Sequence, residues 1–153
     1  EIVEGESWLR FPPGERHEAV CQRLHERVAG ALAALPSARL LPPRSIVQLL
    51  PGTMLRPDLS LVAAATGKLW LAAEVIASDD HRSDTVLKKA LYEQANLPRL
   101  WMIDPRYDNV EIYHGGQYGL ALKTILGGQE ILTEALLPGF QYITAELFSG
   151  VTP

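Results

Sequence analysis

Two acidic residues in apolar surroundings are the clearest candidates for chemistry in this sequence. Asp58 follows Pro57 at the start of the apolar stretch LSLV, and Glu74 is the single charged residue in the stretch LWLAAEVI. Two carboxylates that converge in an apolar setting cannot both stay ionised without a cation. A hard divalent ion with oxygen ligands relieves that repulsion, so the pair is typical of a metal site.

A lysine follows this pair along the chain. Asp84, Lys88 and Tyr92 recur at i, i+4 and i+8, so on a helix they would form one polar edge. A lysine near a divalent ion can orient a water molecule or stabilise charge on a phosphate. Lys88 is therefore the third candidate, and Asp84 and Tyr92 are its neighbours.

The same residues have ordinary structural interpretations. Asp58 after a proline is typical of a turn. Glu74 can be a buried carboxylate that is paired with an arginine such as Arg56. Lys88 can be a solvated helix residue, and the adjacent Lys89 is an alternative candidate. Taken together, Asp58, Glu74 and Lys88 favour a site over three separate structural roles.

Other reactive residues give weaker signals. His17 is expected at the surface or capping a helix, and His25 lies eight residues on, outside the i, i+4 spacing of helical metal pairs. Cys21 has no clear base partner, which argues against a nucleophilic thiol. His81 lies in the polar stretch 77–83, where a solvated loop is expected rather than a metal cluster.

Hydrophobic periodicity predicts the elements that must position these residues. Helices are predicted from about 15 to 35 and from about 83 to 95, the second with Ser83 as its N-cap. Strands or hairpin segments are predicted at 1–11, 45–50, 56–63, 69–76, 99–104, 123–133, 139–144 and, with a turn at Gly115–Gly116, over 109–122. This order predicts an α/β or α+β fold, with helices covering a mixed central sheet and an antiparallel C-terminal extension.

Composition limits the class of protein. The 153 residues fit one domain, with 47% hydrophobic and 21% charged residues. The net charge of −4 weighs against binding nucleic acid by bulk electrostatics, but a local basic strip or a bridging metal is compatible with it. The single cysteine and the lack of any membrane-length apolar run or signal peptide predict a cytoplasmic location. Because the chain begins at Glu1 rather than Met, further N-terminal sequence is expected.

The order of several short motifs resembles a known family. The motifs, in chain order, are EIVEG (1–5), His17, RPD (56–58), EV (74–75), Asp84, Lys88, Tyr92, LWMIDP (100–105) and LPGFQYITAELF (137–148). With them the chain resembles, over nearly its whole length, the Uma-two-type domain, a bacterial family of mostly uncharacterised proteins in the PD-(D/E)XK superfamily of restriction-endonuclease-like nucleases.

This resemblance implies one restriction-endonuclease-like domain over residues 1–153 and a metal-dependent endonuclease acting on nucleic acid, with DNA favoured over RNA. Asp58, Glu74 and the Val75 carbonyl would hold Mg²⁺ or Mn²⁺, which activates a water and polarises the phosphate. Lys88 would be catalytic together with the two acids. The supporting positions would be Glu1, His17, Asp84 and Tyr92.

One departure from the family pattern keeps alternatives open. In the standard motif a lysine follows the second acid by two residues, and here that position is Ile76. The resemblance implies that Lys88 of the following helix replaces it. The missing lysine and the negative charge also favour an inactive nuclease-fold module for interaction or regulation, including a homodimer with Tyr113 and Tyr118 at its interface. Hydrolysis of another phosphate ester, such as a nucleotide, is a third alternative.

Overall fold

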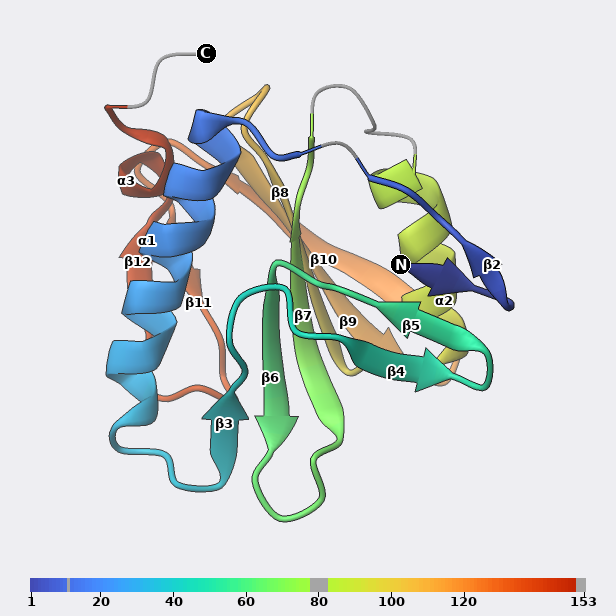
Figure 1. The fold of residues 1–153 in the computed structure, drawn as a ribbon. Coiled ribbons are helices and arrows are strands. Elements are labelled where there is room, and N and C mark those ends of the chain that lie inside the picture. The colour runs from blue at the N-terminus through green and yellow to red at the C-terminus, as the bar shows by residue number, and fades with distance from the viewer. Residues whose placement is uncertain (11, 78–82, 151–153) are drawn as a thin grey trace.

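A central mixed sheet with helices on its two faces organises the chain (Figure 1). The structure is a computed structural model that describes residues 1–10, 12–77 and 83–150, with the backbone alone described at Ser83 and Asp84. Its elements are β1 (Ile2–Val3), β2 (Glu6–Ser7), α1 (Glu15–Leu32), β3 (Ala38–Leu40), β4 (Val47–Leu50), β5 (Thr53–Leu55), β6 (Leu59–Ala63), β7 (Leu69–Val75), the π-helical segment η1 (Ser83–Lys88), α2 (Lys89–Gln94), β8 (Arg99–Asp104), β9 (Asn109–Gly116), β10 (Gly119–Gly127), β11 (Ile131–Thr133), β12 (Gln141–Ile143) and α3 (Thr144–Phe148).

The central sheet confirms the predicted fold class. Its six strands run in the order β10-β9-β8-β7-β6-β3, and β7 and β8 are parallel while the other neighbours are antiparallel. Parallel neighbours need a crossover, and η1 with α2 supplies it. A second sheet, β2-β1-β5-β4, packs the N-terminal hairpin beside this crossover, as Figure 1 shows. Among the described helices, none is long and apolar enough to cross a membrane.

Strand β7 is buried on both faces, as its nearly continuous apolar sequence predicted. Leu71, Ala73 and Val75 belong to the core cluster that includes the buried face of α1. Side chains alternate along a strand, so Ala72 and Ile76 belong to the opposite cluster with α2. Glu74 lies on this second face, where its exposed fraction is 0%.

Several predicted boundaries differ from the structure because pairing between strands that are distant in sequence determines where the strands begin and end. Short strands β3 and β5 were not predicted, and each is stabilised by pairing to another strand, β6 and β4 respectively. The segment 123–127 continues β10 rather than joining the last pair, since β10 follows β9 to Gly127. The helix predicted over 83–95 begins as π-helix and ends at Gln94. The proposed Ser83 cap lies outside the described side chains.

The hairpin turn between β9 and β10 is at Gln117–Tyr118, so the prediction of Gly115–Gly116 was wrong. Gly116 pairs with Gly119, which leaves the two residues between them as the turn. Gly115 is required for close packing of two backbone segments, because a Cβ there would lie 2.2 Å from the backbone oxygen of Leu97. The glycine allows β9 to approach the loop that follows α2.

Replacing Gly115 by Ala should therefore destabilise the fold by about 2 kcal/mol, because backbone must shift to admit the methyl group. Gly116 is the matched control, since a Cβ there meets nothing within 4 Å. Gly116→Ala should change the free energy of unfolding by less than about 0.5 kcal/mol. Urea denaturation of both variants measures the difference, and equal effects would contradict this role for Gly115.

The tyrosines proposed for an interface differ in exposure. Tyr118 in the turn is 93% exposed, but Tyr113 is only 8% exposed. The Tyr113 hydroxyl donates to Glu111, and the Lys89 ammonium lies 4.6 Å from its ring centroid. The expectation that Tyr113 is an exposed interface residue was therefore wrong, because its ring is covered by neighbours on β9 and α2.

Candidate active site

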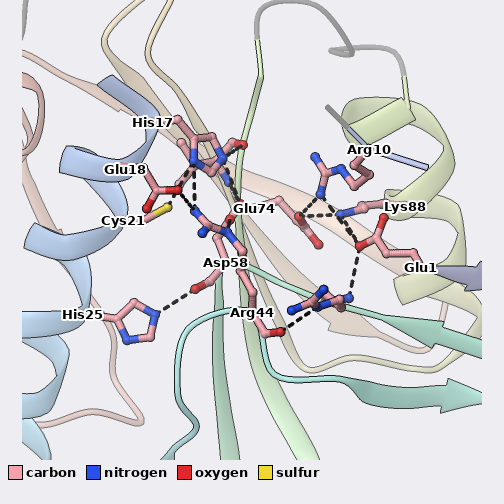
Figure 2. Close-up of polar contacts among 12 residues, drawn as sticks. Glu1, Arg10, His17, Glu18, Cys21, His25, Arg44, Asp58, Glu74 and Lys88 are labelled. Atoms are coloured by element: carbon pink, nitrogen blue, oxygen red, sulfur yellow. Dashed lines mark hydrogen bonds and ion pairs between the residues drawn. The ribbon is translucent and has the colours of Figure 1, made fainter. Parts of the chain in front are cut away.

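The candidate residues form two neighbouring groups where several elements end, one around Asp58 and one around Glu74 and Lys88 (Figure 2). Asp58 immediately precedes β6, and the antiparallel register places it beside the end of β7, where Glu74 lies. Lys88 ends η1, and the β1–β2 hairpin brings in Glu1. Figure 2 shows His17 reaching toward Asp58 from α1, with Lys88 and Glu1 gathered near Glu74 on the other side.

Asp58 is held by donors from the strand beside it. Its side chain is 3% exposed; Oδ2 accepts from the Val75 N–H at 2.8 Å, and Oδ1 accepts from the Arg44 Nε at 3.2 Å. Burial alone would raise the pKa of Asp58, but the hydrogen bond from His17, the hydrogen bond from the Val75 N–H and the charge of Lys88 outweigh it, so that pKa lies below its usual value. Asp58 is thus a fixed, ionised carboxylate.

Glu74 is fully buried and has polar partners on both oxygens. Its Oε2 accepts from the Lys88 ammonium at 2.8 Å, and its Oε1 accepts from the Tyr92 hydroxyl. The Arg10 Nη1 lies 3.8 Å from Oε2. Burial, followed by the charge of Glu74, raises the pKa of Tyr92 well above its ordinary value. The tyrosine therefore remains a donor that fixes the orientation of the carboxylate.

Lys88 joins two acidic residues that are distant in sequence. Its ammonium lies 2.9 Å from Glu1 Oε1 as well as 2.8 Å from Glu74 Oε2, and its side chain is 3% exposed. Burial excludes the solvated-helix interpretation of Lys88. Arg56, considered as a partner for Glu74, instead donates from its backbone N–H to Glu1 and from its Nε to the Arg44 carbonyl.

His17 lies at the centre of the site and not at the surface. It is 9% exposed, and its Nε2 is 2.9 Å from the Val75 carbonyl and 3.4 Å from Asp58 Oδ2. Its Nδ1 is 3.4 Å from Arg44 Nη2 and 3.6 Å from the sulfur of Cys21. Two acceptors face Nε2 and two donors face Nδ1, so the tautomer with its proton on Nε2 satisfies all four contacts.

Two neighbours on α1 complete the surroundings of Asp58. His25 Nε2 donates to the Asp58 backbone carbonyl at 2.7 Å. Burial, and then the charge of Asp58, raise the pKa of the Cys21 thiol well above its ordinary value. The thiol therefore stays protonated, which agrees with the prediction that Cys21 is no nucleophile. The i, i+4 spacing of His17 and Cys21, visible in the sequence, was the signal that the sequence analysis missed.

The oxygen atoms of this site match a hard cation in type. Magnesium prefers carboxylate and carbonyl oxygens, which Asp58, Glu74 and Val75 offer. The His17 Nε2 contacts both Asp58 Oδ2 and the Val75 oxygen, so these two oxygens are neighbours around the imidazole ring. The side chain of Asp84 and the residues 78–82, which include His81, lie outside the described part.

A pocket of about 380 Å³ opens onto Asp58, His17 and Glu1, whereas Glu74 is fully buried behind it. Acidic residues and arginines both line it, together with a wall from the N-terminal segment: Glu1, Trp8, Leu9, Arg10, Pro12, Pro13, His17, Arg44, Arg56, Asp58 and Ala77. Three arginines at the mouth provide the local positive charge that the overall charge of −4 does not show. Arginine suits phosphate groups because its planar fork can donate two hydrogen bonds.

Comparison with known proteins identifies a matching family model and solved structures of similar fold. A family model described as "Uma2: Putative restriction endonuclease" matches residues 1–146. The crystal structure of "a putative nuclease belonging to DUF820 from Anabaena variabilis ATCC 29413" has a TM-score of 0.79 and 14% identity over 96% of this chain and 88% of that chain. At this identity the likeness shows the fold.

Two further comparisons add no evidence about the fold or the function of this chain. A chain of the DrdV–DNA complex has a TM-score of 0.42 and 12% identity, covering 70% of this chain but 12% of its own length. No curated protein matches this chain.

Proposed function

The chain belongs to the Uma2 family of restriction-endonuclease-like proteins, and from this premise we propose that it is a divalent-metal-dependent endonuclease acting on DNA rather than RNA. The observation that carries the proposal is the buried ion pair of Lys88 and Glu74. It lies near the buried carboxylate of Asp58, whose pKa is below its usual value. Removing such charges from water costs several kcal/mol for each ion. Groups held at that cost beside a pocket are typical of a functional site.

Asp58, Glu74 and the Val75 carbonyl would hold Mg²⁺ or Mn²⁺. When bound, such an ion lowers the pKa of a water molecule and polarises the scissile phosphate. Tyr92 orients Glu74 by donating to Oε1, and the Val75 N–H orients Asp58 by donating to Oδ2. These contacts fix the directions of the two carboxylates before substrate arrives.

Lys88 would be the catalytic cation. It stands between Glu1 and Glu74, so its ammonium is positioned to hold a water molecule or to stabilise negative charge on the phosphate. Ile76, at the usual lysine position, instead packs in the apolar cluster beside Leu91 and Tyr92. The lysine from η1 reaches the same face of β7 that a lysine at position 76 would have used.

An inactive module for interaction or regulation is the second candidate. The observation that favours it is the charge balance around the three acidic residues, since Arg10, Arg44 and Lys88 already neutralise them without an ion. In this alternative the exposed Tyr118 would be available for a partner such as a second copy.

Metal binding can be measured without a substrate. Mg²⁺ or Mn²⁺ at about 100 times its dissociation constant should stabilise the wild type by about 2.7 kcal/mol, which raises the Tm by roughly 5–10 °C. Asp58→Ala and Glu74→Ala should show no shift, because each removes an oxygen ligand. Glu134→Ala is the control, as Glu134 is also a buried acid but pairs with Arg99. An unchanged Tm of the wild type would contradict the metal site.

A further inference from the structure

We propose that His17, Cys21 and Asp58 form a second, softer metal site, which takes Zn²⁺ and thereby inhibits the hard-ion site that shares Asp58. The inhibition rests on the proposed nuclease function, but the binding of zinc does not. All three side chains are buried, with exposed fractions of 9%, 5% and 2%. One ligand atom from each lies within 4.8 Å of the others.

The spacing of His17 and Cys21 matches two ligands of a tetrahedral zinc ion. His17 and Cys21 are four residues apart on α1, so they project from one face of the helix. Their Nδ1 and sulfur atoms are 3.6 Å apart. Zinc bonds of about 2.0 Å to nitrogen and 2.3 Å to sulfur, at a tetrahedral angle, place these atoms about 3.6 Å apart. Little movement of the helix is therefore needed to bind the ion.

The two sites differ in the metal that they favour. Thiolate and imidazole are soft ligands that select zinc and related ions, whereas carboxylate and carbonyl oxygens suit Mg²⁺ and Mn²⁺. Zinc binding would replace the S–H proton of Cys21, which is released to solvent. His17 and the Cys21 thiolate thus add a preference that Asp58 alone lacks. With three protein ligands, the fourth position would remain for water, as in exchangeable zinc sites. The pocket that His17 and Asp58 line provides a route of access.

The histidine ring connects zinc binding to inhibition. Zinc would bind the Nδ1 lone pair, which leaves the proton on Nε2. Nε2 then continues to donate to the Val75 carbonyl, 2.9 Å away, as second-shell partners of metal-bound histidines commonly do. That carbonyl is one of the proposed ligands of the hard ion. Because both sites need Asp58, zinc bound there would exclude Mg²⁺ or Mn²⁺.

Arg44 is the cation that zinc would displace. Its Nε lies 3.2 Å from Asp58 Oδ1 and its Nη2 lies 3.4 Å from His17 Nδ1, so one guanidinium contacts two of the three ligands. Its side chain is 30% exposed and also pairs with Glu18 at 2.6 Å. The Glu18 contact gives Arg44 a partner to retain when it moves outward.

Cobalt(II) is a direct probe, because a thiolate bound to Co²⁺ gives a charge-transfer band in the near ultraviolet. Wild-type protein should show this band, and Zn²⁺ should remove it by displacing the cobalt. Cys21→Ala and His17→Ala should lack the band. His25→Ala is the matched control and should keep it, since His25 lies on the same helix but contacts the Asp58 backbone. A folded wild type without the band, or a band that persists in Cys21→Ala, would overturn the proposal.

Two further measurements test displacement and inhibition. Arg44→Ala should lower the half-saturating Co²⁺ concentration at least tenfold, and an unchanged value would refute the displacement of Arg44. Where Mn²⁺-dependent DNA cleavage is observed, Zn²⁺ should slow cleavage by the wild type. The same concentrations of Zn²⁺ should leave the cleavage rate of Cys21→Ala unchanged relative to its rate without zinc. If no cleavage occurs under any condition, the nuclease proposal fails while the cobalt band still decides the zinc site.

Discussion

Lys88→Ala is expected to abolish metal-dependent DNA cleavage and to lower the free energy of unfolding by about 3–5 kcal/mol. The stability loss arises because the variant leaves Glu1 and Glu74 without their shared ammonium, and removing one partner of a buried ion pair strands a buried charge. The cleavage rate should fall at least ~100-fold, because the lysine is the proposed stabiliser of transition-state charge. Nicking of a supercoiled plasmid with Mn²⁺ measures the first effect, and urea denaturation measures the second.

Lys89→Ala is the matched control for this experiment. The two lysines are adjacent, but the Lys89 ammonium lies over the Tyr113 ring and makes a cation–π contact at 4.6 Å. Its loss should cost about 1 kcal/mol and leave cleavage unchanged. Full cleavage by folded Lys88→Ala would show that Lys88 is a structural ion-pair partner and not a catalytic residue, whereas a lack of cleavage by the folded wild type would support the inactive-module alternative.

The sequence was sufficient to predict the strand that carries Glu74. A short, nearly continuous apolar run after a glycine turn favours a strand covered on both faces, and a single acid within it needs a buried partner. Lys88 was a reasonable partner because a crossover helix returns over the same face of the sheet. The structure brings Lys88 to Glu74 in this way, fourteen residues along the chain.

The surroundings of Asp58 were less predictable. Arg44 and Arg10 reach the acids from segments without regular structure, and long side chains from such segments have no periodicity that gives their direction. His17 was misjudged because its environment depends on Val75, which is 58 residues away. The local spacing of His17 and Cys21 was available, but only the fold shows that both face Asp58.

Strands β3 and β5 illustrate the same limit at the level of the fold. Each has three residues, too few for a period-2 pattern to distinguish a strand from a loop. Hydrogen bonds to a neighbour make them strands, and β5 in turn holds β1 and so the Glu1 end of the chain near Lys88. One acidic residue of the candidate site thus depends on the least predictable part of the fold.

Glu74→Gln should separate catalysis from stability more cleanly than any alanine variant. The amide has the shape of the carboxylate, and its oxygen can still accept from Lys88, which also keeps Glu1 as a charged partner. The amide NH2 then faces the Tyr92 hydroxyl, which can accept instead of donating. The free energy of unfolding should therefore fall by only about 1–2 kcal/mol. An amide is a poor ligand for Mg²⁺ or Mn²⁺, so the Mn²⁺-induced rise in Tm should disappear and plasmid cleavage should fall at least ~100-fold.

Glu134→Gln is the matched control for Glu74→Gln. Glu134 is also a buried carboxylate, paired with Arg99 at 3.1 Å, but it lies in the C-terminal segment after β11. A similar loss of stability with unchanged cleavage and an unchanged Mn²⁺ shift is expected for this variant. If Glu74→Gln cleaves as fast as the wild type, then Glu74 is a structural ion-pair residue like Glu134. The buried network would then be an internal clamp that joins β7, η1 and the N-terminal hairpin, without a role in hydrolysis.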